Sequence, residues 1–98
     1  MTMRVYLQAP LTIGSGTKVT ASTTGEPLIT GDAPVEYAYT IILQPAGNYA
    51  VNVGMSAAKT EFQIPSGGQL TLQIDQLSKI FVKTATAGQG VNYIWYRT

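Results

Sequence analysis

The residue types that most often do chemistry in proteins are scarce in this chain. It contains neither His nor Cys, so it lacks the commonest general base, the commonest metal ligand and a thiolate nucleophile. The acids that remain are Glu26, Asp32, Glu36, Glu61 and Asp75. A glycosidase needs two carboxylates about 5 to 9.5 Å apart across one sugar, and none of these acids lies in a recognisable motif. We therefore expect solvated surface carboxylates, no enzyme activity, no metal and no cofactor.

The other potentially reactive groups also favour structural roles. Asp75 follows a predicted strand and precedes a turn, where its side chain can accept hydrogen bonds from the next backbone N–H groups. The glycine-containing loops do not combine a buried strand, the required glycine spacing and a following helix, as a phosphate-binding loop does. The serines have no partner base. The sequence thus predicts neither a phosphate site nor an activated nucleophile.

Length and composition indicate one domain with an unusual surface. The chain has 98 residues, which predicts a single β-sandwich domain over residues 1–98. Hydrophobic residues make up 45% and charged residues only 11%, against roughly 25% charged in typical proteins. A Thr-rich pleated surface would explain so little charge. Faces covered by neighbouring molecules would explain it equally well, because interface cores are depleted of charge.

The charge distribution disfavours nucleic acids and membranes as partners. The formal net charge is +1, and the basic residues are scattered along the chain: Arg4, Lys18, Lys59, Lys79, Lys83 and Arg97. Phosphate neutralisation requires a clustered basic surface, which this sequence does not predict. No apolar run approaches the ~20 residues that span a bilayer, and the N-terminus has no secretory signal pattern. These features predict a protein made and kept in a cytoplasm.

Short runs of alternating hydrophobicity, separated by Gly, Pro, Ser and Asn, predict an all-β fold. The clearest run covers residues 35–44, where one face carries Val35, Tyr37, Tyr39, Ile41 and Leu43, with Ile42 as the exception on the other face. Strict alternation of this length excludes a helix. Further strands are expected at 4–7, 49–54, 61–64, 69–75, 79–84 and 91–96, with turns or hairpins at 44–48, 65–68 and 85–90.

Two stretches are less clear. Residues 12–22 contain two glycines, which suggest a bend or bulge before a strand at 17–21. Residues 27–30 read as an edge strand. Residues 56–59 could form a single helical turn, and no other helix is predicted. In the strand at 61–64, Phe62 and Ile64 should point inward. The total is about seven to eight antiparallel strands in a β-sandwich, jelly-roll-like if eight form.

The final strand is apolar on both faces. Val91, Tyr93 and Trp95 lie on one side, and Ile94 and Tyr96 on the other. Such a strand is either covered on both sides within the domain or has one face against a partner. In the first case Trp95 belongs to the core and a loop covers Ile94 and Tyr96. An aromatic platform for sugars is a further option, but it needs coplanar rings exposed together.

Several segments resemble small proteins encoded among the virion genes of tailed bacteriophages. The resemblance lies in residues 42–48 (ILQPAGN), 51–54 (VNVG), 64–68 (IPSGG), 70–75 (LTLQID), 77–82 (LSKIFV) and 85–93 (ATAGQGVNY). It covers a little over half of the chain, and its motifs are turn and core positions. The first 40 residues have no counterpart. No functional residue is carried over from this resemblance.

The resemblance implies a structural role in a virus particle. It suggests a head decoration or cement protein, or an accessory particle protein. As a decoration or cement protein it would lie on the capsid surface, bound to the major capsid protein lattice and forming trimers or dimers. A rim strand or terminal arm commonly adds edge contacts, so the interface residues we expect are Arg4, Tyr6, Ile94, Tyr96 and Arg97. The alternative is a carbohydrate- or receptor-binding β-sandwich module of a phage fibre or tail.

Overall fold

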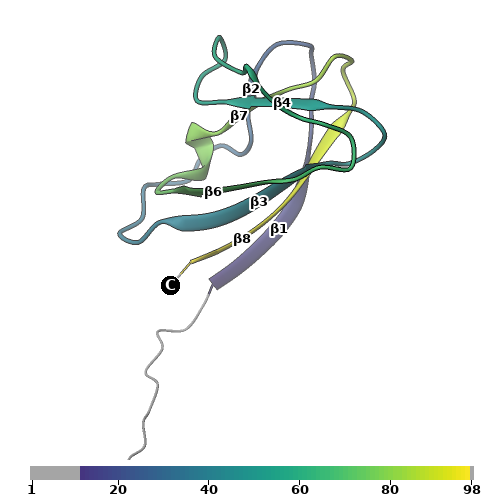
Figure 1. Cartoon of the computed structure of the whole chain (residues 1–98). Coiled ribbons are helices and arrows are strands. Elements are labelled where there is room, and N and C mark those ends of the chain that lie inside the picture. Colours follow the sequence, from purple (N-terminus) through teal and green to yellow (C-terminus); the bar gives the residue numbers. More distant parts are fainter. Residues whose placement is uncertain (1–11, 98) are drawn as a thin grey trace, which may run out of the picture.

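The computed structural model describes residues 12–97 and has two antiparallel four-stranded sheets packed face to face (Figure 1). Sheet A contains, in spatial order, β1 (Thr12–Val19), β8 (Gly90–Arg97), β3 (Tyr39–Pro45) and β6 (Leu70–Ile74). Sheet B contains β2 (Glu26–Pro27), β7 (Phe81–Lys83), β4 (Val51–Gly54) and β5 (Phe62–Ile64). One 3-10 turn, η1 (Leu77–Lys79), joins β6 to β7. The predicted all-β sandwich is confirmed; the strand expected at 4–7 lies outside the described residues.

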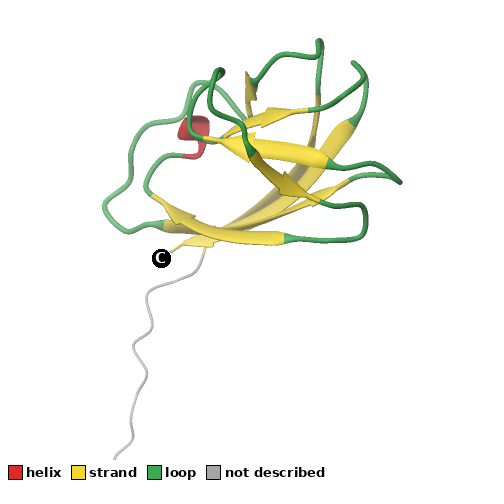
Figure 2. Cartoon of the chain, turned by 45° about the horizontal axis from the view of Figure 1, so that its top comes forward, coloured by secondary structure: helices red, strands yellow, loops and turns green. Residues whose placement is uncertain are grey.

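The strand order is that of a jelly roll. β1 pairs with β8, β2 with β7, β3 with β6 and β4 with β5, as in one long hairpin rolled over on itself, and β3–β8 and β4–β7 contacts complete the two sheets. β4 and β5 are the one pair of consecutive strands that hydrogen-bond to each other. The turns at 44–48, 65–68 and 85–90 are therefore not hairpins. Each carries the chain from one sheet to the other across the core (Figure 2).

The core forms where the inward faces of the two sheets meet. In β3, Tyr39, Ile41 and Leu43 are buried, while Thr40 and Ile42 between them are only partly covered. The buried hydrophobic residues are Leu28, Tyr39, Ile41, Leu43, Val51, Val53, Ile64, Leu77, Ile80, Val82 and Val91. Full burial of one such side chain contributes roughly 1.5 to 3 kcal/mol, so this layer supplies the main drive for folding.

β1 is one continuous strand, and the bend expected at its glycines is wrong. Its register with β8 runs without a break from the Thr12–Arg97 pair to the Val19–Gly90 pair. The glycines are required by packing: an added Cβ at Gly14 would lie 2.3 Å from the Trp95 ring, and one at Gly16 would lie 2.7 Å from the Tyr93 hydroxyl. Large rings that lie over glycines on the neighbouring strand fill the space that a side chain would occupy.

Two inward-facing residues predicted from alternation are in fact exposed. β3 begins only at Tyr39, because the chain bends at residues 36–37, and Tyr37 is left 61% exposed. Phe62 is 58% exposed because β5 forms the margin of sheet B. The edge strand expected at 27–30 is shorter and begins earlier, as β2, and its continuation inserts Leu28 into the core. Residues 56–59 form a turn closed by an isolated bridge.

Asp32, rather than Asp75, supplies the backbone cap after β6. Asp32 Oδ2 accepts hydrogen bonds from Leu77 N–H at 2.8 Å and from Ser78 N–H at 3.3 Å. Asp75 instead forms an ion pair with Lys79 at 2.9 Å, and this contact lowers the pKa of its carboxyl. The cap ties the loop before β3 to the connection between β6 and β7.

Candidate functional site

The outward side of sheet A is a broad surface formed by all four of its strands. Register places its residues in rows across β1, β8, β3 and β6. The rows are Ile13–Tyr96–Thr40–Gln73, then Ser15–Ile94–Ile42–Thr71, then Thr17–Asn92–Gln44. We call this set of residues the outer face of sheet A.

An apolar patch occupies two rows of the outer face of sheet A. Ile13 is 63% exposed and lies opposite Tyr96, which is 44% exposed. Ile94 is 46% exposed and lies opposite Ile42. Directly opposed residues on one face of antiparallel strands have Cβ atoms about 5 Å apart, so these side chains form a contiguous surface. The loop cover considered for Ile94 and Tyr96 is not present within residues 12–97.

The outer face of sheet A carries no charged side chain. Its polar members are Ser, Thr, Asn and Gln. The one charged residue of β1, Lys18, has the opposite parity and forms an ion pair with Glu26 at 3.2 Å. The free energy needed to desolvate a surface without charge is comparatively low, because an unpaired charge has the largest desolvation cost.

A shallow hollow of about 320 Å³ lies within this face. Its side-chain lining is aliphatic at Ile42 and Ile94 and amide at Gln44, Gln69 and Asn92. A second hollow of about 270 Å³ shares Gln44 and Asn92 and continues over the loops at 45–48 and 66–68. Thr17 Oγ1 donates a 2.6 Å hydrogen bond to Asn92 Oδ1, which holds that amide in place. The combined surface offers neutral donors and acceptors beside aliphatic groups.

A different, almost purely apolar hollow of about 230 Å³ opens at the margin where β5 and β6 part. It is lined by Val53, Gly54, Met55, Phe62, Leu70 and Leu72. Met55 and Phe62 are each 58% exposed. This hollow lies on another side of the molecule from the outer face of sheet A.

The structure brings together only part of the predicted interface. Ile94 and Tyr96 are neighbours on the outer face of sheet A. Arg97 has the opposite parity, and its guanidinium lies over the Tyr39 ring, 5.6 Å from the ring centroid. Arg4 and Tyr6 lie outside the described residues. Tyr96 and Arg97, both expected at the interface, thus lie on opposite sides of sheet A, because side chains alternate along β8.

Sequence reasoning missed Ile13 and Ile42. Ile42 was visible as the exception to the alternation in β3, and an outward aliphatic residue in an otherwise regular strand is a usable signal. Ile13 lay in a stretch whose strand character was obscured by Gly14 and Gly16. Only the pairing of β1 with β8 places Ile13 opposite Tyr96.

Trp95 is not an exposed platform for sugars. Its side chain points inward from β8 and packs against the core. Its ring meets Tyr39 edge-on, with centroids 4.9 Å apart and an interplanar angle of 88°, and Gly14 lies against it. The interpretation of Trp95 as a core residue is supported by these contacts.

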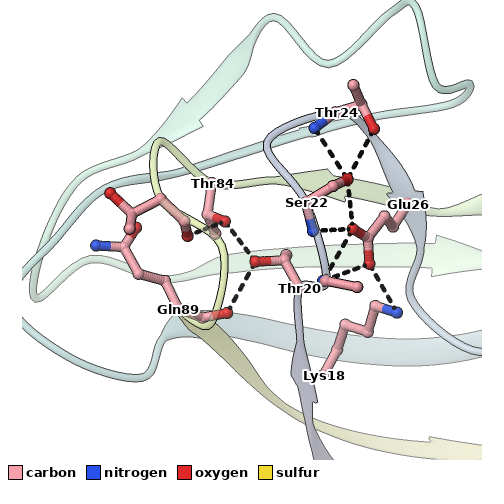
Figure 3. Close-up of polar contacts among 9 residues, drawn as sticks. Lys18, Thr20, Ser22, Thr24, Glu26, Thr84 and Gln89 are labelled. Atoms are coloured by element: carbon pink, nitrogen blue, oxygen red, sulfur yellow. Dashed lines mark hydrogen bonds and ion pairs between the residues drawn. The ribbon is translucent and has the colours of Figure 1, made fainter.

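Glu26 is the most heavily bonded of the carboxylates, and its partners are structural (Figure 3). It accepts hydrogen bonds from the N–H groups of Ala21 and Ser22 and from the Ser22 hydroxyl, between 2.8 and 3.1 Å, and pairs with Lys18. The hydrogen bond from Ala21 is the largest influence, and together these contacts lower the pKa of Glu26 to about 2. The group thus stays ionised and binds the loop between β1 and β2.

The described residues contain no cluster of three or more Asp or Glu side chains able to hold a metal ion. Between residues 12 and 97, no helix is long and apolar enough to cross a membrane. The chain matches no protein-family model and no curated protein.

Proposed function

We propose that this protein is a structural, non-enzymatic domain that binds another protein through the outer face of sheet A. The observation that carries this proposal is the combination of exposed Ile13, Ile94 and Tyr96 with the complete lack of charge on that face. Depletion of charged residues is a compositional mark of interface cores. It also accounts for a chain in which only 11% of residues are charged.

The size of the face predicts low affinity for a single contact and higher overall affinity when many copies bind together. Four strands of five to eight residues, about 4.8 Å apart and at about 3.3 Å per residue, give on the order of 450 Å² per partner. A total of about 900 Å² is just below the ~1,000 Å² expected of a specific interface and is typical of weak contacts. Such a contact gains most when many copies bind a repeating array.

The resemblance to virion proteins supplies the kind of partner. We propose a capsid decoration or cement role, in which the outer face of sheet A rests on a lattice of major capsid protein. Jelly rolls occur among viral capsid and lectin domains, which is compatible with this role. The proposed location is the capsid surface.

The test is co-sedimentation with shells assembled from the major capsid protein proposed as the partner. The double variant Ile94→Asp/Tyr96→Asp adds two charges to the face and should weaken shell binding at least tenfold, which corresponds to about 1.4 kcal/mol. Gln63→Asp, on exposed β5 of sheet B, is the matched control and should bind like wild type. Failure of the wild-type protein to bind shells, or undiminished binding by the double variant, would contradict the proposal.

The amide-lined hollow supports a second candidate function, recognition of a neutral saccharide. Gln44 and Asn92 offer paired donors and acceptors suited to adjacent hydroxyls, and Ile42 and Ile94 can cover the apolar side of a sugar ring. Glycan-array screening of wild type and Gln44→Ala tests it. Glycan binding that is lost in Gln44→Ala while shell binding persists would assign the hollow to sugars; a blank array would remove this candidate.

A further inference from the structure

We propose that the edge of β1 that pairs with no other strand of residues 12–97, here called the free edge, pairs with β1 of a second copy of this chain. The two strands would run antiparallel about a two-fold axis at Gly16, and the two A sheets would join into one continuous sheet. This inference rests on the edge of the sheet, whereas the proposed function rests on its face, so each can fail without the other. β1 lies at the margin of sheet A (Figure 1).

β1 is the longest unpaired edge among the described strands. It has eight residues, whereas the other marginal strands have five in β6, three in β5 and two in β2. Short edges are one way in which proteins prevent unwanted strand pairing. The marginal strands β2, β5 and β6 are short in this sense, whereas β1 is not.

The hydrogen bonds of Thr20, directly after β1, show which backbone groups of β1 face the free edge. Thr20 N–H donates to Gln89 O at 2.9 Å, and Thr20 O accepts from Gly88 N–H at 2.8 Å, so the backbone of Thr20 faces the β8 side. Backbone direction alternates along an antiparallel strand. The N–H and C=O groups of Ile13, Ser15, Thr17 and Val19 therefore point away from β8, toward the free edge.

One register uses all four of these residues. With the two-fold axis at Gly16, Ile13 lies opposite the partner's Val19, and Ser15 lies opposite the partner's Thr17. Ile13 and Val19 are 63% and 56% exposed and lie at opposite ends of β1 on the same face. The two-fold symmetry repeats this contact, so the dimer would cover Ile13 and Val19 in both copies. A register shifted to an axis at Ser15 would leave Val19 without a β1 partner.

Charge does not oppose this pairing. Lys18 is the one charged residue of β1, and it would lie opposite the partner's Gly14 rather than a second lysine. Inward-pointing charges on edge strands usually discourage pairing. Here the Lys18 ammonium is tied to Glu26 at 3.2 Å, on the inner side of the sheet. Apart from Lys18, the seam would contain only hydroxyl, glycine and aliphatic residues.

The expected dimer is modest in affinity and enlarges the candidate binding surface. A single strand pair buries less than the roughly 1,000 Å² that is the lower limit for a specific interface, so we expect an association that depends on concentration. A two-fold axis perpendicular to the sheet keeps both outer faces on the same side. The dimer would therefore present two copies of the uncharged face side by side to one flat partner.

Disulfide trapping tests both the edge and the register, because the chain has no cysteine of its own. In the double variant Ile13→Cys/Val19→Cys, the thiol at position 13 of each copy would face the thiol at position 19 of the other copy. Cα atoms of paired residues are about 5.5 Å apart, within disulfide range. Oxidised glutathione would accept the two electrons and two protons as each bond forms. We expect a covalent dimer from the double variant and monomers from each single-cysteine variant.

A proline at the edge is the second test. Ser15→Pro removes an N–H that points to the free edge, and proline is tolerated at such positions. Sedimentation velocity from about 1 µM to about 1 mM should show a dimer for wild type and for the control Ser15→Ala, and a monomer for folded Ser15→Pro. A wild-type chain that stays monomeric throughout overturns the proposal. So does a dimer that Ser15→Pro preserves and the double cysteine variant fails to trap.

Discussion

At the scale of single residues, Glu26 shows how a carboxylate with dense contacts can be structural. Its oxygens accept N–H groups from Ala21 and Ser22, and Lys18 lies 3.2 Å away. Hydrogen bonds to the charged form stabilise it and lower the pKa, here to about 2. A perturbed carboxyl can mark an active site, but this one is fully engaged by the loop that it orders.

The depressed pKa of Glu26 predicts a loss of stability in acid. The unfolded chain takes up this proton near pH 4.5, and the folded chain only near pH 2. The contribution of ionised Glu26 to the free energy of unfolding is therefore complete above about pH 4.5 and is lost progressively as the pH falls toward 2. Urea denaturation between these limits should show a steeper decline for wild type than for Glu26→Gln. At neutral pH, Glu26→Gln should cost roughly 1 kcal/mol.

Glu61→Gln is the matched control for Glu26→Gln, because Glu61 is an exposed residue of the β4–β5 loop. Its pH profile should follow that of wild type. If Glu26→Gln and Glu61→Gln give the same pH profile, the bonded carboxylate is not the group responsible.

At the scale of elements, β1 depends on its neighbour β8 for its shape. Gly14 and Gly16 would weaken an isolated strand, since glycine costs the most conformational entropy on folding. Trp95 and Tyr93 from β8 cover these positions and replace the missing side-chain contacts. The pair of strands is thus one packing unit, and β1 remains continuous along its whole length.

A methyl group at Gly14 should disrupt this unit. The added Cβ of Gly14→Ala would lie 2.3 Å from the Trp95 ring, and Tyr39 packed edge-on limits the movement of that ring. We expect a destabilisation of about 1 to 3 kcal/mol, typical of overpacking. Urea unfolding followed by the fluorescence of Trp95, the one tryptophan, measures it. The control Ser15→Ala, on the outward side of β1, should change the free energy of unfolding little. If Gly14→Ala were as stable as wild type, the packing explanation would be refuted.

At the scale of the whole molecule, a buried threonine pair connects the two sheets at one end (Figure 3). Thr20 follows β1 of sheet A and Thr84 follows β7 of sheet B, and their hydroxyl oxygens are 2.6 Å apart. Thr20 Oγ1 also lies 3.2 Å from Gln89 O, and Thr84 Oγ1 lies 3.0 Å from Thr86 O. Because each hydroxyl has one proton, one threonine donates to the other while the second donates to its carbonyl oxygen. This contact joins the sheets through polar groups where the hydrophobic core ends.

A double-mutant cycle should reveal this connection. Thr20→Val and Thr84→Val should each cost roughly 1 to 2 kcal/mol, because each leaves a buried hydroxyl with one partner fewer. The double variant should lose less than the sum, since both hydroxyls are then absent. Thr20→Ser, which keeps the hydroxyl, should stay closer to wild type. Strict additivity in chemical denaturation would show that the two groups do not interact.

Much of the secondary structure could be predicted from local alternation. The runs ending at Leu43, Val53 and Ile74 all form strands with the expected inward faces. The first half of the clearest run was wrong, since Tyr37 precedes the strand. Phe62 was placed inward because its parity matches Ile64, but parity does not report how far the opposite sheet extends.

The candidate site was predictable only in its C-terminal part. Ile94 and Tyr96 stand out because β8 is apolar on both sides, a property contained within one strand. Ile13 joins them through the pairing of the first described strand with the last. That pairing joins segments distant in sequence, and nothing in the local pattern of residues 12–19 specifies it.

The lack of reactive groups, the all-β class and the scarcity of charge follow from residue types and their alternation, because both are properties of composition and short segments. Which surface receives the uncharged residues depends on which strands are neighbours. The sheet order β1-β8-β3-β6 gathers them on one face, while Lys18 and Arg97 turn to the other side. Local patterns determine which way a side chain points, and non-local pairing determines what lies beside it.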